Sequence, residues 1–352
     1  MKTYPGISVL LTGASGVIGS ALLNELDDAS VTCLVHRTPI RRSGVDHVRG
    51  DISRPRLGLT RAEFALLADR VDVVVHAAAM TDFTADESVT TDLNVNGTAN
   101  VLEFAARADA PLYYVSTAFV QRASQLRDIG DCGGPSAYLC SKRAAEQLVS
   151  KSGIPAVVIR PSVVIGDSDS GQIAAFQGLH AIAGAMLKGV LPLVPLLPDA
   201  LIDFVPQDYV ADAIASLLRS GQQDGEYWLT AGDQALRASD MVDACMEVAD
   251  SLGRSIDAPR LIAPDAVDRL IRPVFIEPLP EQARNRFDHM LNTTALFSAD
   301  AAFPSSAAEL ERRFGLVLPA DLRATFVRSL EFWATQRGLV APLGSESLPV
   351  AA

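Results

Sequence analysis

A glycine-rich turn near the N-terminus constrains the fold more than any other feature of this chain. Gly13, Gly16 and Gly19 follow an apolar run at residues 7–11, and a helical pattern begins directly within the turn. Because glycine has no side chain, backbone N–H groups at such a turn can closely approach a negatively charged pyrophosphate. The first glycine allows the tight turn, the second the approach to the phosphates, and the third the packing of helix on strand. The turn therefore predicts a dinucleotide-binding βαβ unit.

Strand and helix patterns alternate through the first half of the chain. Apolar runs predict strands at residues 7–11, 31–35, 45–48, 71–76, 112–115 and 156–159. Helical spacing predicts helices at 16–26, 60–68, 93–106 and 136–150. The second of these helices begins with Thr60 and Glu63, a capping box. This order is typical of an α/β protein with a doubly wound parallel sheet of the Rossmann type.

The pattern changes after Arg160 and Pro161. Prolines and glycines punctuate residues 166–206, a strand and a helix return at 203–218, and residues 235–339 are mostly helical and broken by loops. We expect a Rossmann domain of residues 1–165 and 207–232, and a smaller, mostly helical substrate-binding lobe of residues 166–206 and 233–340. Residues 341–352 are expected to form a tail.

The end of the second predicted strand bears on the choice of cofactor. NAD-binding sites place a carboxylate there, whereas NADP-binding sites place an arginine. The strand here runs into His36 and Arg37 with no acidic residue, and Arg41 and Arg42 follow, so we predict NADPH rather than NADH. Asp51 comes after the third strand, where its carboxylate could accept a hydrogen bond from an adenine amine. The small residues at 77–79, after the fourth strand, would let the backbone touch the cofactor.

Tyr138 and Lys142 are four residues apart and share one face of the helix predicted at 136–150. A phenol has an ordinary pKa of about 10, and a nearby ammonium together with the positive charge of an oxidised nicotinamide is expected to lower that pKa by favouring the phenolate. The lysine could also hold ribose hydroxyls. The pair therefore predicts a site that transfers a proton.

Polar side chains near this pair complete the predicted site. Thr117 lies at the carboxyl end of the fifth strand, where it could donate a hydrogen bond to the substrate oxygen beside Tyr138. Ser116 is the adjacent candidate, but it is expected to face away because side chains alternate along a strand. Asn94 could fix the backbone or a water chain near Lys142, although asparagine within a helix is often only a local hydrogen-bonding group.

Together these residues resemble the extended short-chain dehydrogenase/reductase superfamily over about residues 5–232. The resemblance is carried by Thr12-Gly13-x-x-Gly16-x-x-Gly19, Asp51-Ile52, Asn94-Val95-x-Gly97-Thr98, Ser116-Thr117 and Tyr138-x-x-x-Lys142. Residues 50–59, 176–179, 191–192 and 203–211 are further similar to thioester reductases, as found in carboxylic acid reductases, peptide-synthetase terminal reductase domains and fatty acyl-CoA reductases. The family's arginine at the second strand stands one place later here, as His36-Arg37, and the C-terminal lobe matches only loosely.

The resemblance implies that Thr117, Tyr138 and Lys142 are catalytic, with Asn94 beside them, and that NADPH donates the hydride. The residues expected to bind the cofactor are Gly13, Ser15, Gly16, Val17, Ile18, Gly19, His36, Arg37, Asp51, Ile52, Ala77, Ala78, Ala79, Lys142, Pro161 and Val163.

We therefore expect an NADPH-dependent reductase of an acyl thioester bound to coenzyme A or to a carrier protein. The product would be an aldehyde, with an alcohol if a second round follows. The same catalytic residues also serve ketoreductases, secondary-alcohol dehydrogenases and nucleotide-sugar epimerases or dehydratases, so these remain alternatives. A third alternative is a protein that senses NAD(P) without catalysis.

Charge and composition exclude several other classes. Lys and Arg number 30 against 42 Asp and Glu, a formal charge of −12 with no basic block, so nucleic-acid binding is not expected. The five histidines have no metal-ligand spacing, and no metal is expected. No uninterrupted apolar span reaches the roughly 20 residues of a bilayer helix, and the N-terminus has no signal-peptide pattern. We expect a cytoplasmic protein, with a homodimer as the assembly to consider.

Overall fold

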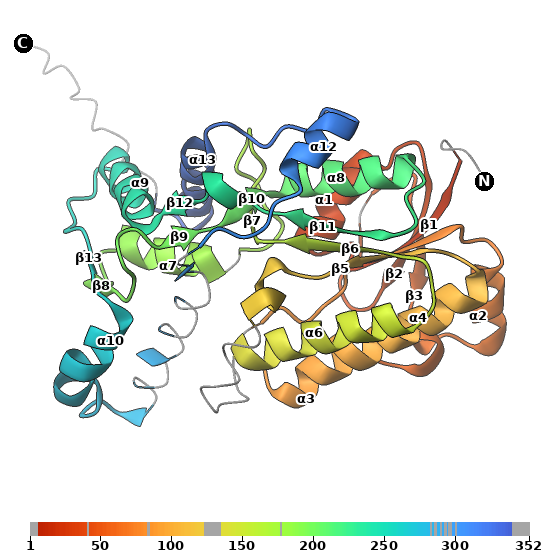
Figure 1. Cartoon of the computed structure of the whole chain (residues 1–352), viewed down its shortest axis with the longest axis horizontal. Coiled ribbons are helices and arrows are strands. Elements are labelled where there is room, and N and C mark those ends of the chain that lie inside the picture. The colour runs from red at the N-terminus through yellow and green to blue at the C-terminus, as the bar shows by residue number, and fades with distance from the viewer. Residues whose placement is uncertain are drawn as a thin grey trace, which may run out of the picture.

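Seven parallel strands form the central sheet of the protein (Figure 1). The computed structural model describes residues 6–339 except 41, 83–84, 123–134, 177, 282–283, 285–286, 289–290, 292–293, 295–297 and 300, so Arg41 and the predicted tail lie outside the described residues. The strand order is β11-β6-β5-β4-β1-β2-β3. The strands are β1 (Ser8–Thr12), β2 (Ser30–Val35), β3 (Asp46–Arg49), β4 (Val73–His76), β5 (Leu112–Val115), β6 (Ala156–Pro161) and β11 (Gly225–Leu229). The predicted α/β class with a doubly wound parallel sheet is confirmed.

Helices cover both faces of this sheet (Figure 1). One face carries α1 (Val17–Glu25) and α8 (Gln207–Arg219), and the other carries α2 (Arg61–Ala68), α3 (Glu87–Thr90), α4 (Gly97–Ala108) and α6 (Pro135–Lys151). The predicted capping box at the start of α2 is confirmed, since Thr60 and Glu63 exchange hydrogen bonds. The helix predicted at 93–106 begins instead as a π-helix, η2 (Thr91–Asn96), which runs into α4.

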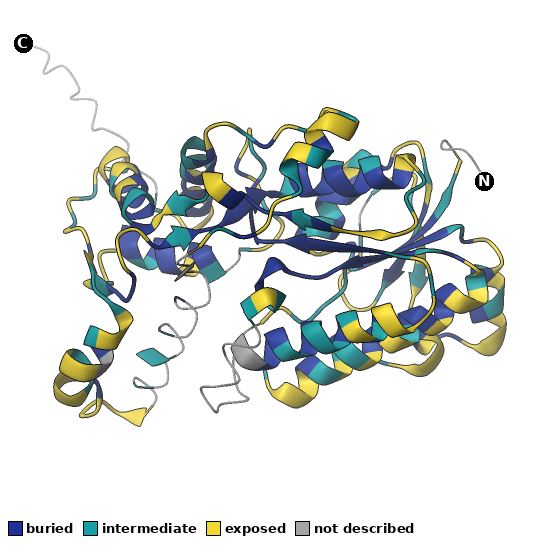
Figure 2. Ribbon diagram, viewed as in Figure 1, coloured by how far each residue is buried: buried dark blue, intermediate teal, exposed yellow. Residues whose placement is uncertain are grey.

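Alternation along the strands explains why both faces need covering. Val9 and Leu11 pack into the core beneath α1 and α8, whereas Leu10 between them packs into the core beneath α2, α4 and α6. All three side chains are fully buried. Figure 2 shows the central strands as the most continuously buried part of the fold. Apolar runs of this kind are typical of parallel strands that are covered on both faces.

The strand order reverses at β1, which pairs with β4 on one side and with β2 on the other. The chain therefore leaves the sheet in opposite directions at this point, and a crevice opens at the carboxyl ends of these strands. The glycine turn begins directly after β1, so the topology places it at this crevice.

A second group of elements lies beyond one end of the sheet (Figure 1). Helices α7 (Gly178–Leu187), α9 (Ala238–Ser251) and α13 (Leu322–Gln336) pack against one another there. Short strands form three small sheets: β7 (Val163–Ile165) with β10 (Phe204–Pro206); β8 (Leu193–Val194) with β13 (Arg260–Leu261); and β9 (Leu201–Ile202) with β12 (Leu236–Arg237) and β14 (Ser298–Ala299). Helix α10 (Pro264–Ala266) and the π-helix η5 (Val267–Ile276) extend from this group.

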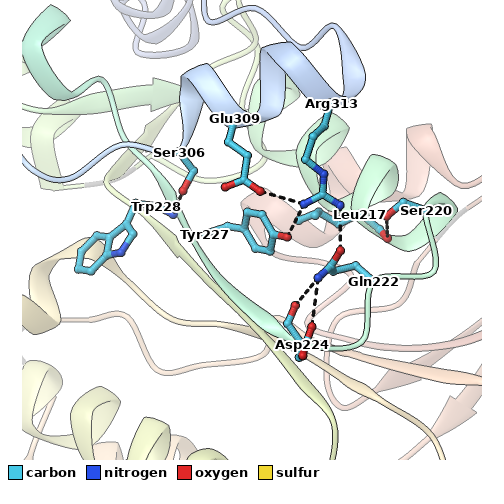
Figure 3. A network of polar contacts seen from close by, with 9 residues as sticks. All are labelled: Leu217, Ser220, Gln222, Asp224, Tyr227, Trp228, Ser306, Glu309 and Arg313. Atoms are coloured by element: carbon cyan, nitrogen blue, oxygen red, sulfur yellow. Dashed lines mark hydrogen bonds and ion pairs between the residues drawn. The ribbon is translucent and has the colours of Figure 1, made fainter.

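One helix from the C-terminal part returns to the edge of the central sheet. Helix α12 (Ala307–Phe314) lies against β11, where Arg313 Nη1 donates to Tyr227 Oη at 2.8 Å and Nη2 donates to Gln222 Oε1 at 2.8 Å (Figure 3). The backbone N–H of Ser306 donates to the carbonyl of Trp228 at 2.9 Å. The range 233–340, predicted as the substrate-binding lobe, thus includes a helix that contacts the predicted Rossmann domain.

Candidate active site

Two of the three glycines in the turn are required by the fold. Gly13 has φ +76°, and a Cβ there would lie 2.5 Å from the backbone nitrogen of Ala78. A Cβ on Gly19 would lie 2.2 Å from the carbonyl oxygen of Gly13. Gly16 differs, because its φ of −81° suits any residue and a Cβ would meet only the oxygen of Gly13, at 3.2 Å. Gly16 is the N-cap of α1 and makes no side-chain cap, which leaves the start of this helix accessible to an anion.

A buried histidine holds the turn against the next strand. Thr12 Oγ1 and His76 Nδ1 form a hydrogen bond of 2.7 Å, and His76 Nε2 lies 3.2 Å from Thr98 Oγ1. Burial, together with the nearby charge of Lys142, lowers the pKa of His76 to about 3, so the ring is neutral. Thr12 Oγ1 also accepts from the backbone N–H of Ala78 at 3.3 Å, which fixes the segment after β4.

Two cavities meet at the glycine turn, and Gly13, Gly16, Ala77 and Ala79 line both of them. The first, of about 290 Å³, lies at the ends of β1, β2 and β3. The second, of about 190 Å³, lies at the ends of β5 and β6. Among the predicted cofactor-binding residues, the first cavity is lined by Gly13, Ser15, Gly16, His36, Arg37, Asp51, Ile52, Ala77, Ala78 and Ala79, and the second by Gly13, Gly16, Val17, Ile18, Gly19, Ala77, Ala79, Lys142, Pro161 and Val163.

The first cavity has an arginine and a carboxylate at its far end. Arg37 is exposed and has no ion-pair partner within the described part of the chain. Arg42, in contrast, forms an ion pair in which its Nη2 lies 2.8 Å from Asp27 Oδ1. Asp51 accepts two hydrogen bonds from Ser53 and lies 3.7 Å from His36. Although burial alone would raise the pKa of Asp51, these contacts hold it below its usual value. Asp51 therefore stays ionised near neutral pH.

Tyr138 and Thr117 meet in the second cavity, from α6 and from the end of β5. Both are buried, and their side chains share a hydrogen bond. Burial raises the pKa of Tyr138 to about 12, and the bond to Thr117 opposes this only in part. In the protein alone this pKa is not lowered by Lys142, because the cost of burying a phenolate is the largest influence on it.

Lys142 lies one turn along α6 from Tyr138 and is 2 % exposed. Its Nζ donates to the carbonyl of Val115 at 2.7 Å and lies 4.4 Å from the ring centroid of Tyr114. Burial lowers the pKa of Lys142 to about 7, although Glu146 partly opposes this shift. The ammonium is thus held close to its point of deprotonation.

Asn94 acts on the backbone and not on Lys142 directly. Its amide accepts from the N–H of Met80 at 2.7 Å and donates to the Met80 carbonyl at 3.0 Å. It also donates to Ser141 Oγ at 2.9 Å, one residue before Lys142. Asn94 therefore ties α6 to the segment after β4. The π-helix η2 places it there, and such helices often occur near functional sites.

Ser116 also lines the second cavity, contrary to the expectation that it faces away. Strict alternation fails because β5 ends at Val115, so Ser116 and Thr117 belong to the turn that leads into η3 (Ala118–Arg122). Sequence reasoning did not assign six further lining residues to the site: Thr81, Val115, Phe119, Ser162, Val164 and Gly178. Val115 ends a predicted strand and Gly178 lies in the stretch 176–179 that resembles thioester reductases, whereas the other four are signalled only by their position shortly after predicted strands.

A larger open hollow, of about 1150 Å³, lies between α6 and β11. Arg160, which lines it, is paired with Glu146 at 2.8 Å and with Glu226 at 2.6 Å. Neither the glycine turn nor Tyr138 reaches this hollow. Three of its charged side chains pair with one another, and it lacks the glycine turn and the hydroxyl pair, so the candidate site is the pair of cavities at the glycine turn.

Metal-ligand clusters and membrane-spanning helices are both absent from the described ranges. No group of three or more His, Cys, Asp or Glu side chains in them is arranged to hold a metal ion. No helix in them has the length and apolar character to cross a membrane.

Comparison with known proteins identifies relatives of this chain. A family model described as male sterility protein matches residues 38–214, which include Thr117, Tyr138 and Lys142. The glycine betaine reductase ATRR of Emericella nidulans is 32% identical over 256 residues, 60% of this chain and 20% of that protein. The hybrid PKS-NRPS synthetase pvhA of Talaromyces variabilis is 30% identical over 229 residues, 60% of this chain and 6% of that protein. The chain thus spans a small part of these relatives.

Solved structures extend the likeness to nearly the whole chain. The terminal R domain of the myxalamid PKS-NRPS pathway superposes with a TM-score of 0.72 and 25% identity, over 95% of this chain and 92% of that one. A reductase domain of a nonribosomal peptide synthetase from Mycobacterium tuberculosis superposes with a TM-score of 0.68 and 22% identity, over 97% of this chain and 94% of that one. A UDP-glucose 4-epimerase from Thermotoga maritima superposes with a TM-score of 0.62 and 15% identity, over 94% of this chain and 100% of that one. This likeness is one of fold alone.

Proposed function

The chain belongs to the male sterility protein family, within the thioester reductase branch of the extended short-chain dehydrogenases and reductases, and from that premise we propose that it reduces an acyl thioester with NADPH. The expected NAD(P)-dependent oxidoreductase class follows from this membership. The substrate, the choice of NADPH and the roles of single residues are parts of the proposal.

One observation carries the proposal: two cavities join at a glycine turn, with Arg37 at one end and the Thr117–Tyr138 pair at the other. An extended dinucleotide needs this shape, with its phosphates at the helix start and its two rings in separate cavities. Gly16 supports the fit, since its φ suits any residue and a Cβ there would make only one tight backbone contact, at 3.2 Å from the oxygen of Gly13. Gly13, Gly16 and Ala77 would hold the phosphates, and Lys142 the ribose of the nicotinamide. When bound, the cofactor supplies a hydride.

The side chains of the second cavity suit reduction. A pKa of about 12 keeps Tyr138 protonated at neutral pH, so its hydroxyl can donate a proton to the acyl oxygen. Thr117 can hold the same oxygen, because its hydroxyl already meets that of Tyr138. The hemithioacetal then collapses: its hydroxyl gives up the proton as the C–S bond breaks, and the departing thiolate takes up a proton, which leaves an aldehyde and a free thiol.

Arg37 supports NADPH over NADH. It lines the first cavity, is exposed and has no ion-pair partner in the described ranges, so its guanidinium is available for a 2′-phosphate. No carboxylate follows β2 directly, which is where an NAD site would place one.

The C-terminal elements around α7, α9 and α13 are proposed to receive the acyl group. Gly178 at the start of α7 lines the second cavity, which puts these elements beside Tyr138. A carrier protein or coenzyme A would present the thioester from this side. The similar structures include a thiolation-reductase di-domain from an archaeal nonribosomal peptide synthetase, at 20% identity and a TM-score of 0.69, which is consistent with a carrier partner.

The test is to follow NADPH absorbance while the protein meets acyl-CoA, acyl-pantetheine and simple ketones in separate reactions. We expect oxidation that depends on a thioester and yields an aldehyde and a thiol. Turnover of ketones alone would reject the substrate class. Tight retention of NAD with no net cofactor turnover would favour an epimerase instead.

A further inference from the structure

Ser116 has a hydroxyl that the fold does not use. The residue is 5 % exposed, and its Oγ is buried with no hydrogen-bond partner in the described part of the chain. Leaving a buried hydroxyl unpaired is unfavourable, so such groups usually have a reason. Its backbone is already satisfied, since Ser116 N–H donates to the carbonyl of Ile159 at 2.7 Å. The unpaired hydroxyl therefore contributes nothing to the fold that alanine would not.

Ser116 lines the same cavity as Thr117, Tyr138 and Lys142. Each of those three already has a chemical task in the proposed reaction. Thr117 and Tyr138 form one pair of hydroxyls that can meet a single acyl oxygen. Lys142 gives one N–H to Val115 and keeps two for ribose hydroxyls.

At the reacting end of a nicotinamide dinucleotide, the carboxamide is the polar group that these three leave unmatched. It offers both donors and an acceptor, so a serine hydroxyl can bind it in either sense. We propose that Ser116 is a cofactor-positioning residue whose hydroxyl binds the nicotinamide carboxamide and so fixes the ring against Thr117 and Tyr138. The inference rests on the proposed dinucleotide site, but not on the identity of the reduced substrate.

The experiment compares two ligands that differ by the nicotinamide half. Dissociation constants for NADP⁺ and for 2′,5′-ADP are measured by titration calorimetry on the full chain and on Ser116→Ala. We expect Ser116→Ala to bind NADP⁺ about five- to tenfold more weakly, the value of one hydrogen bond, and to bind 2′,5′-ADP as well as the parent does. Without ligand, the variant should unfold at no lower temperature, because it loses only an unpaired hydroxyl.

Ser162→Ala is the matched control. It removes a second buried hydroxyl from the same cavity, one that makes no hydrogen bond within the described residues but lies near enough to Asp203 to oppose the rise in the pKa of that buried carboxyl. The control should show no selective loss of affinity for NADP⁺ over 2′,5′-ADP.

Three results would overturn the inference: an unchanged affinity of Ser116→Ala for NADP⁺, an equal loss of affinity for NADP⁺ and 2′,5′-ADP, or the same selective loss of NADP⁺ affinity in Ser162→Ala. If Ser116→Ala raises the KM for the thioester while its NADP⁺ affinity is unchanged, the hydroxyl binds the substrate and not the cofactor. That result also refutes the inference. If the parent protein binds neither ligand, the proposed function itself has failed, and this outcome is distinct from the others.

Discussion

Replacing Lys142 by methionine should make the protein inactive and, at neutral pH, more stable. The lysine is 2 % exposed, and burial lowers its pKa from 10.5 to about 7. Between these two pH values the unfolded chain holds a proton that the folded chain has largely given up. The stability of the parent protein therefore rises with pH across this window, whereas methionine has no proton to lose.

The magnitude follows from those two pKa values. At pH 7, burying Lys142 costs about 4 kcal/mol, and at pH 9 about 2 kcal/mol. Methionine removes that cost but leaves the carbonyl of Val115 without its donor, which costs about 1–3 kcal/mol at both pH values. Lys142→Met should thus be more stable than the parent by about 1–3 kcal/mol at pH 7. This advantage should shrink by about 2 kcal/mol at pH 9 and disappear above pH 10.5.

Urea unfolding of both proteins at pH 7 and pH 9, without added dinucleotide, measures this change. Lys151→Met is the control, because Lys151 is an exposed lysine at the end of the same helix and reports the effect of removing a solvated cation. After subtraction of the control, a difference that stays constant from pH 7 to pH 9 would refute the reasoning, since burial would then not have moved the lysine's titration.

Three further predictions concern the cofactor and the proton donor. Tyr138→Phe should lower kcat by about 10²–10⁴-fold while NADP⁺ affinity is retained, and a loss of affinity instead would argue against a proton-transfer role. Gly16→Ala should fold but bind dinucleotide at least about tenfold more weakly, whereas Gly19→Ala should lose thermal stability because its Cβ would lie 2.2 Å from a carbonyl oxygen. The reverse pattern would contradict the roles assigned to the two glycines. Arg37→Ala should weaken the binding of NADPH by about tenfold or more and leave the binding of NADH unchanged. Arg42→Ala is the control and should change neither affinity, because the guanidinium of Arg42 is paired with Asp27.

Local patterns in the sequence were enough to predict much of the fold. The inner strands of the sheet are short apolar runs, and a parallel strand buried on both faces has no other simple composition. The capping box of α2 involves residues three apart, so nothing distant was needed to predict it. The glycine spacing has a local cause at Gly13 and Gly19, where a side chain would strike the turn itself or the adjoining segment after β4.

Features that depend on what surrounds a residue were predicted less well. The pKa of Tyr138 in the protein alone is raised because burial is set by many side chains distant in sequence, which the spacing of Tyr138 and Lys142 does not reveal. Ser116 was expected to face away because the end of β5 could not be placed to the residue. No sequence signal places α12 against β11, since Arg313 and Tyr227 are 86 positions apart in the chain.

The sequence by itself therefore determined which chemistry this protein has available: a turn for a pyrophosphate, a phenol, an amine and two hydroxyls, each announced by spacing within one element or at its end. Only the tertiary structure decided how these groups titrate and which of them face the same cavity. The physical reason is that spacing acts over a few bonds, whereas desolvation and cavity shape are set by contacts between segments far apart along the chain.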